Sequence, residues 1–209
     1  MILIGQYDSP FVRRVAIALR VYEIAFEHRP WSTFSDADKI APFNPLCRVP
    51  TLVLDDGEVL IESAAILDHL DELAGPAKAM MARHGVPRRQ ALKVCALATG
   101  LGDKAVSLVY ERVLHKDKSQ VWVERCQRQI AGVLDALDAD RRKQTTPWWF
   151  GDRIGHADIA VGCVLRFTCE AHPGVFDEAR WPALAVHAAK CEALPVFLEI
   201  VQPFLSPSG

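Results

Sequence analysis

Ser9 and Ser63, with the residues beside them, are the groups of this sequence best placed to do chemistry. Ser9 stands between a short apolar segment, 2–4, and an apolar run that begins after Pro10, a pattern that predicts a strand, a turn and a helix. A helix N-terminus has unpaired N–H groups and a partial positive charge, so it favours an anion. A serine hydroxyl there can donate a hydrogen bond to a thiolate, or it can only cap the helix.

Ser63 stands at the start of a second helix. The residues before it, 51–61, form two apolar segments around an Asp-Asp-Gly turn, which predicts a β-hairpin. The apolar helical pattern that follows opens on Glu62 and Ser63, and we expect Ser63 to be its N-cap. The N-terminus of this helix is therefore a second place where an anionic group could bind.

The wider pattern predicts an α/β unit followed by an all-helical one. Strands are expected at 1–5, 26–29 and in the hairpin, with a helix at 11–22, so that the unit covers 1–75. The segment 76–87 is rich in proline and glycine and predicts a linker. Beyond it the strand patterns end, and the unit 88–209 is expected to hold helices at 88–115, 119–143, 157–170, 182–193 and 195–201.

The composition excludes several classes of function. The 209 residues are 50% hydrophobic and 24% charged, with a net charge of -2, which predicts neither a nucleic-acid partner nor a membrane surface. No apolar run approaches the roughly 18 residues that span a bilayer, and no basic region precedes the first strand as in a signal peptide. We therefore expect a cytoplasmic protein.

The cysteines and histidines give no sign of a metal site. None of the six cysteines is spaced as CxxC, so we expect buried free thiols in a reducing compartment. The seven histidines are scattered and form no HExxH pair, so no bound metal is expected.

Four local patterns, taken in order, carry a family resemblance over nearly the whole chain. They are YDSPFVRR at 7–14, NPLCRVPTL at 44–52, ESAAI at 62–66, and WPAL with LPVF at 181–184 and 194–197. Together they resemble the cytosolic glutathione transferase superfamily, and the first resembles its serine-type bacterial classes. The resemblance implies a thioredoxin-like βαβ-ββα domain, an all-helical C-terminal domain, glutathione as co-substrate and a homodimer.

The resemblance also implies a role for each motif residue. The peptide bond before Pro50 is expected to be cis, which presents the Val49 backbone to an extended peptide ligand; the alternative is a trans proline at a strand start. Glu62 would take the ammonium group of glutathione, and the Ser63 hydroxyl and N–H its carboxylate. Phe11 belongs to the same binding set. Arg48 would lie near the glycyl carboxylate, or it is a solvated surface residue.

Ser9 would keep the glutathione sulfur ionised and would not itself be the nucleophile. A free thiol has a pKa near 8.5, so lowering it by two units requires about 2.7 kcal/mol of differential stabilisation. A charge-assisted hydrogen bond and the helix dipole are of that size. Tyr7 is the rival donor, because tyrosine-type members use a tyrosine at the end of this strand. Serine cannot form a mixed disulfide, so glutaredoxin-like thiol transfer is disfavoured.

The second substrate would be a small hydrophobic electrophile held between residues 7–11 and the first long helix. Asp103, Tyr110 and Arg112 are the candidates from that helix, with core packing or a salt bridge as their alternative roles. The chemistry would be transfer, isomerisation or dehalogenation. The competing hypothesis is a non-catalytic binding or regulatory protein of the same fold.

The sequence departs from the family at one cap. A Ser/Thr-x-x-Asp capping box usually precedes the buried helix of the C-terminal domain, and here the stretch begins with Gly155 and ends with Asp158. Glycine is tolerated at an N-cap at a loss of a few tenths of a kcal/mol. We expect Asp158 to accept a hydrogen bond from the Gly155 N–H.

Overall fold

The computed structural model describes residues 1–207. The N-terminal part of the chain forms a four-stranded mixed sheet. Its order is β2-β1-β3-β4, formed by β1 (Ile2–Ile4), β2 (Glu27–Arg29), β3 (Thr51–Val53) and β4 (Val59–Ile61). β2 runs parallel to β1, whereas β3 is antiparallel to both β1 and β4. The predicted hairpin and the thioredoxin-like fold are confirmed.

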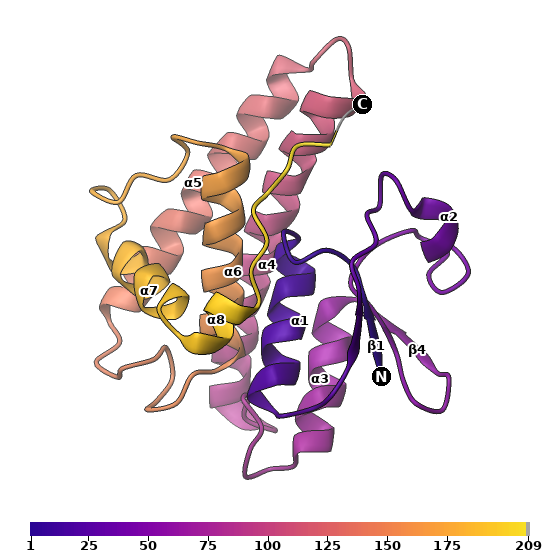
Figure 1. The fold of residues 1–209 in the computed structure, drawn as a ribbon. Coiled ribbons are helices and arrows are strands. Elements are labelled where there is room, and N and C mark those ends of the chain that lie inside the picture. The colour runs from indigo at the N-terminus through magenta and orange to yellow at the C-terminus, as the bar shows by residue number, and fades with distance from the viewer. Residues whose placement is uncertain (208–209) are drawn as a thin grey trace.

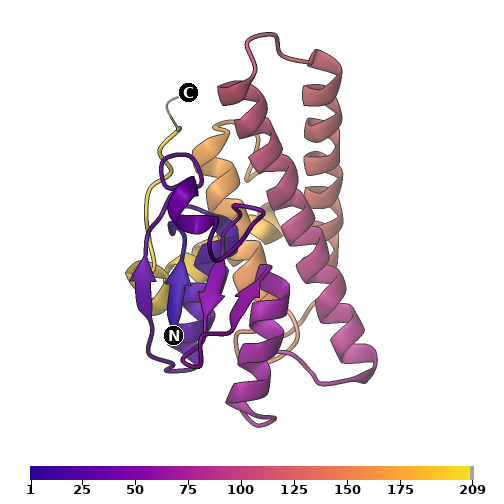
Figure 2. The same cartoon turned by 90° about the vertical axis from the view of Figure 1, so that its right-hand side faces the viewer.

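The helices fall into two groups, which are divided in the sequence between residues 74 and 85. α1 (Pro10–Val21) and α3 (Ser63–Ala74) lie between the sheet and the helical domain, and the short α2 (Ala37–Ile40) lies beyond the sheet (Figures 1 and 2). The helical domain contains α4 (Gly85–Leu114), α5 (Gln120–Arg142), α6 (His156–Ala171), α7 (Pro182–Glu192) and α8 (Pro195–Glu199). The predicted all-helical C-terminal domain is confirmed.

Several predicted limits differ from the observed ones. α4 begins at Gly85, inside the predicted linker, because the backbone becomes helical before Pro87, a residue that fits a first helical turn. Ser63 is the first residue of α3 and not its N-cap, which is Glu62. α8 ends at Glu199, two residues earlier than expected. The domain boundaries at residues 75 and 88 stay predictions.

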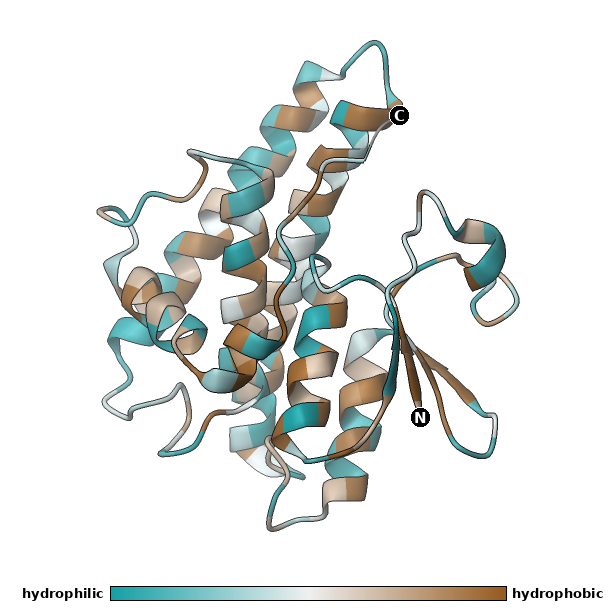
Figure 3. Ribbon diagram, in the orientation of Figure 1, coloured by the Kyte–Doolittle hydropathy of each residue, from teal (hydrophilic) through white to brown (hydrophobic). Residues whose placement is uncertain are grey.

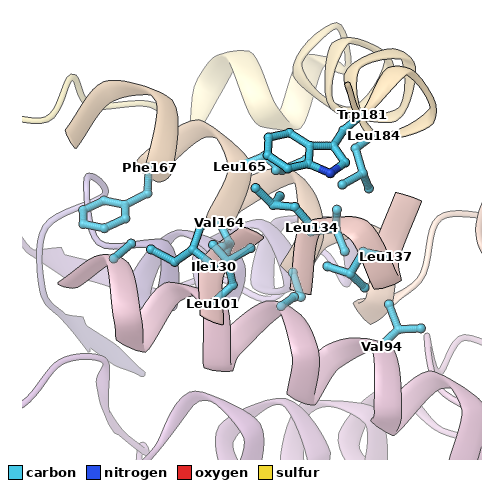
Figure 4. Close-up of a cluster of buried hydrophobic side chains, with 14 of the residues drawn as sticks. Val94, Leu101, Ile130, Leu134, Leu137, Val164, Leu165, Phe167, Trp181 and Leu184 are labelled. Atoms are coloured by element: carbon cyan, nitrogen blue, oxygen red, sulfur yellow. The ribbon is translucent and has the colours of Figure 1, made fainter. Parts of the chain in front are cut away.

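The helical domain has a continuous apolar core. Residues from α4, α5, α6 and α7 point toward one another, among them Leu101, Ile130, Val164 and Leu184 (Figure 4). Figure 3 shows that β1, β3 and β4 are mainly hydrophobic, whereas the edge strand β2 consists of Glu27, His28 and Arg29. α5 alternates hydrophobic and hydrophilic residues because one of its sides faces solvent. None of the helices within residues 1–207 is long and apolar enough to cross a membrane.

The predicted cap of α6 is confirmed. The Gly155 N–H donates to Asp158 Oδ2 at 2.8 Å, and the Trp149 N–H donates to Asp158 Oδ1 at 2.8 Å. The cysteine prediction is partly wrong: all six are free thiols, but Cys169 of α6 is exposed and Cys47, in the loop before β3, is half-buried.

Arg13 joins the two domains. The sequence pattern turns Val12 and Val15 of α1 inward, yet α1 is covered on both sides and Arg13 is buried too. Its guanidinium forms two hydrogen bonds to Glu192, Nη1–Oε1 at 2.5 Å and Nη2–Oε2 at 2.8 Å. It also donates to the carbonyls of Phe197 and Ile200 at 3.0 and 2.8 Å. These contacts fix the end of the helical domain to the helix that follows Ser9.

We predict that Arg13→Met lowers the free energy of unfolding by about 3–5 kcal/mol, because it leaves the carbonyls of Phe197 and Ile200 without a donor and leaves Glu192 with Arg166 alone. Urea unfolding measures this change. The control is Arg20→Met, which removes the exposed Arg20–Glu199 pair at 2.9 Å and is expected to change stability by less than about 1 kcal/mol. Equal effects of the two substitutions would contradict the role given to Arg13.

Candidate functional site

A cleft of about 1050 Å³ lies between the two domains. The turn before α1, the loop before β3 and the N-terminus of α3 form one side of it. α4, Phe167 of α6 and the C-terminal residues 202–207 form the other. The residues predicted to do chemistry that line this cleft are Ser9, Phe11, Arg48, Val49, Pro50, Glu62, Ser63, Asp103 and Tyr110.

Asn44 holds the loop that leads to β3. Its buried amide donates to the Arg48 carbonyl at 2.9 Å and to Thr51 Oγ1 at 3.3 Å, while its Oδ1 accepts from the Leu46 N–H at 3.1 Å. The Val49–Pro50 peptide bond is cis, as predicted. The first residue of the NPLCRVPTL motif therefore positions the segment in which Val49 faces the cleft.

The N-terminus of α3 presents charged and polar groups to the cleft. Glu62 has a φ of 68°, a left-handed conformation that is costly for a residue with a side chain. Its carboxylate lies 3.5 Å from Arg48 Nη1, and both side chains are more than 60% exposed. Ser63 is buried beside them at the first position of the helix. Backbone strain at such a place is typical of functional sites.

The N-terminus of α1 enters the cleft at Ser9. Ser9 is the N-cap residue, but its hydroxyl makes no capping hydrogen bond with the helix that the structure describes. The hydroxyl therefore does not act as a capping acceptor in this structure. Gly5 permits this turn, because a Cβ there would lie 2.5 Å from Val12 Cγ2 and 2.8 Å from Val49 Cβ.

Tyr7 does not line the cleft. Its ring stacks on His28 with the ring centroids 3.9 Å apart, and its N–H donates to Gln202 Oε1 at 3.1 Å. Burial raises the pKa of the Tyr7 hydroxyl, with Arg20 opposing the shift and Glu199 adding to it. Arg20 lies in the last turn of α1, at the opposite end of the helix from Ser9. The tyrosine is thus the less suitable hydroxyl for a ligand in the cleft.

α4 supplies the opposite wall. Gly102 brings it close to the α1 start, since a Cβ at that position would lie 3.2 Å from the Phe11 ring. Tyr110 meets Phe34 edge-to-face, with the centroids 5.4 Å apart. Burial raises the pKa of the Asp103 carboxyl, while Arg48 opposes that shift. Arg112 was predicted for this pocket, but it lies outside the lining and donates to the Ala171 carbonyl at 3.1 Å, which places it at the α4–α6 contact.

Sequence reasoning missed several residues of the cleft. Asp8 stands next to Ser9, and the motif was interpreted through the hydroxyl of Ser9 without a role for the Asp8 carboxylate. The C-terminal segment has no periodic pattern that would place it, yet Phe204 packs edge-to-face on Phe167 at 5.5 Å and its N–H donates to Glu170 Oε2 at 2.8 Å. The missed lining residues include Gln6, Asp8, Thr33, Phe34, Phe167, Gln202 and Phe204.

Comparison with known proteins assigns the chain to a family. The family model for the glutathione S-transferase N-terminal domain matches residues 3–78, and the model for the C-terminal domain matches residues 120–189. The GST-like protein YibF of Escherichia coli K12 is 32% identical over 168 residues, which cover 80% of this chain and 81% of YibF. The chain belongs to the glutathione S-transferase family.

Other members of the glutathione S-transferase family agree with this. A maleylacetoacetate isomerase of Pseudomonas aeruginosa is 29% identical over 94% of this chain and 93% of its own. A glutathione S-transferase from Methylobacterium radiotolerans, in complex with glutathione sulfonate, superposes with a TM-score of 0.90 and 29% identity, covering 100% of this chain and 97% of that one. One from Methylobacillus flagellatus with bound glutathione gives 0.87 and 27%, covering 97% and 99%.

We predict that Asn44→Ala in this glutathione S-transferase lowers the free energy of unfolding by about 1–3 kcal/mol, because buried polar groups lose their partners. Hydrogen exchange should quicken at the Leu46 amide, which bonds to Asn44. Ser35→Ala, in an exposed nearby segment, is the control and should change neither quantity. Unchanged exchange at Leu46 in Asn44→Ala would contradict the proposed positioning of the loop.

Proposed function

We propose that this protein binds glutathione in the cleft, stabilises its thiolate with Ser9, and adds that thiolate to a small hydrophobic electrophile. The observation that carries the proposal is the Ser9 hydroxyl, which lies at the N-terminus of α1 without a capping hydrogen bond within residues 1–207. It lines the same cleft as Val49, Glu62 and Ser63. A residue that served only as a cap would have its hydroxyl engaged with the helix.

Glutathione would lie along the N-terminal side of the cleft. The Val49 backbone would pair with its peptide backbone, and the N-terminus of α3 at Ser63 would receive the γ-glutamyl carboxylate. Glu62 would hold the ammonium group, and Arg48, at its side, the glycyl carboxylate. Phe11 would pack against the cysteinyl part. The bound glutathione sulfonate and glutathione in the two related structures support glutathione as the ligand.

The chemistry would begin with loss of the thiol proton to solvent. At neutral pH only about 3% of a free thiol is ionised. The Ser9 hydroxyl would donate to the thiolate, and the partial positive charge of the α1 N-terminus would add to its stabilisation. The sulfur then attacks the electrophilic carbon, and the leaving group departs or a proton is taken up. Ser9 gains no covalent bond in these steps.

The geometry favours Ser9 over Tyr7, and so favours the serine-type assignment. Tyr7 stacks on His28 and does not line the cleft. A glutaredoxin-like reductase is disfavoured because a serine at position 9 cannot form a mixed disulfide. A non-catalytic member of the family would need no hydroxyl kept free of capping, so the state of Ser9 speaks against that alternative as well.

We also propose a homodimer, on the family resemblance. Large apolar side chains on α3 and α4, among them Leu73, Val86 and Leu92, are 42–53% exposed, and a second copy could cover them. Light scattering should give twice the mass of 23.2 kDa. A monomeric mass at micromolar concentration would contradict the dimer and leave the proposed chemistry of one chain untouched.

We predict that glutathione added at neutral pH gives an ultraviolet thiolate band that titrates below the free thiol value. In Ser9→Ala that apparent pKa should rise by about one to two units, and the transfer rate should fall at least about tenfold, because one charge-assisted hydrogen bond is lost. The dissociation constant of glutathione should change less than about threefold, since the thiol is a small part of the ligand.

Tyr7→Phe is the matched control, because it removes a hydroxyl that lies outside the cleft. It should leave the thiolate band and the rate within about threefold. Saturable heat of binding without a thiolate band in the wild type would favour a binding protein. The absence of both the heat of binding and the thiolate band would contradict glutathione binding itself.

A further inference from the structure

The charges of the cleft are unevenly distributed. Among residues 1–207, the lining contains the carboxylates of Asp8, Glu62 and Asp103 and a single cationic side chain, Arg48. Arg48 and Glu62 lie 3.5 Å apart at the N-terminus of α3 and would both be used by glutathione. The part of the cleft that remains for the second substrate therefore holds Asp8 and Asp103 without a counter-ion from the lining.

Three cationic side chains of α4 and α6 near the cleft already have partners. Arg166 pairs with Glu170 at 2.8 Å and with Glu192 at 3.1 Å. Arg112 donates to the Ala171 carbonyl. Lys104 lies over the Trp122 ring of α5, 5.3 Å from its centroid, although it follows Asp103 in sequence. These side chains would have to leave existing partners to meet a negatively charged substrate.

The neighbours of both aspartates increase the negative potential. Burial raises the pKa of the Asp8 carboxyl, and Glu170 adds to that shift against the Ser9 N–H. Burial likewise raises the pKa of Asp103, with Glu62 adding to the shift and Arg48 opposing it. Both carboxylates line the cleft, where their negative charge opposes the approach of a second anion.

Aromatic rings form the rest of this region. Tyr110 and Phe34 meet edge-to-face on one side, and Phe167 and Phe204 do so on the other. Aromatic faces attract cations and accept neutral rings equally well. They offer no donor to a carboxylate, apart from the tyrosine hydroxyl.

We infer that the second-substrate subsite, bounded by Asp8, Asp103 and these aromatic rings, selects apolar electrophiles that carry no acidic group and binds positively charged ones best. This rests on the proposed function and names its substrate class. Glutathione strengthens the selection, because at neutral pH it carries two carboxylates and one ammonium group, and its thiolate adds a further negative charge. An anionic second substrate would meet repulsion from the protein and from glutathione together.

The substrate class inferred for this chain differs from that of one of its relatives. The isomerase of Pseudomonas aeruginosa, 29% identical to it, is named for maleylacetoacetate, a substrate with two carboxylate groups. A dianion of that kind needs cationic partners for its carboxylates. The described lining of this cleft supplies only Arg48, which faces Glu62. The overall likeness of the two chains therefore does not extend to this substrate.

The test measures binding, so that it does not depend on finding the true electrophile. Three S-benzylglutathiones that differ only in the para substituent, a carboxylate, a carboxamide or a trimethylammonium group, are titrated calorimetrically into the wild-type protein at low salt. We expect the carboxylate to bind about tenfold more weakly than the carboxamide, which is about 1.4 kcal/mol. The trimethylammonium compound should bind at least as tightly as the carboxamide.

Asp8→Asn with Asp103→Asn should bring the three dissociation constants within about threefold of one another, because the two charges are removed at nearly constant shape. Asp152→Asn, at an exposed loop position, is the control and should keep the wild-type order. If the double variant fails to fold, each single variant is measured and should reduce the difference by about threefold.

The outcomes distinguish the two proposals. If glutathione and all three conjugates fail to bind, the proposed function is contradicted and the inference falls with it. If glutathione binds but the carboxylate compound binds as tightly as the carboxamide, only the inference is overturned. If the three conjugates keep the wild-type order of dissociation constants in the double variant, Asp8 and Asp103 are not the source of the selection.

Discussion

Burial of the Arg13 guanidinium between the two domains is the constraint on which the rest of the structure depends. Burying a cation is costly unless its donors are satisfied, and those of Arg13 are satisfied by Glu192, Phe197 and Ile200, all from the end of the chain. The apolar residues of α1 pack against both the sheet and α6, and the Arg13 guanidinium adds hydrogen bonds to the end of the helical domain. Because Ser9 opens this helix, the position of its hydroxyl is fixed relative to both walls of the cleft.

Two helix N-termini meet in the cleft, and each has a distinct environment. α1 begins after Ser9, beside aromatic side chains and the carboxylate of Asp8. α3 begins after Glu62, which has a left-handed backbone conformation and forms an ion pair with Arg48. Helix N-termini attract anions without requiring a full charge from a side chain. This lets the protein hold an anionic ligand such as glutathione in a cleft whose remaining side chains are mostly neutral or negative.

Local patterns predicted much of the fold, and family motifs predicted much of the lining of the cleft. The hairpin, the turn at Ser9 and the long helices follow from apolar periodicity and from turn residues, which act over a few positions. The burial of Arg13 does not, because an amphipathic pattern describes one covered face and α1 has two. Arg112 was misplaced for a similar reason: its neighbour Tyr110 faces the cleft, but two positions along a helix turn a side chain toward α6. The paths of Gln202 and Phe204 depend on contacts with Tyr7 and Glu170, far away in sequence.

The course of the C-terminal segment bears on how the protein is handled. Gln202 accepts a hydrogen bond from Tyr7, and the chain then follows the cleft as far as Pro207 (Figure 1). An affinity tag fused after residue 209 would begin only two residues beyond that lining. Met1, by contrast, precedes β1, whose other end leads to the turn at Ser9, and its ammonium group pairs with the exposed Asp55. A tag fused to the N-terminus therefore adds no residues next to the C-terminal segment that lines the cleft.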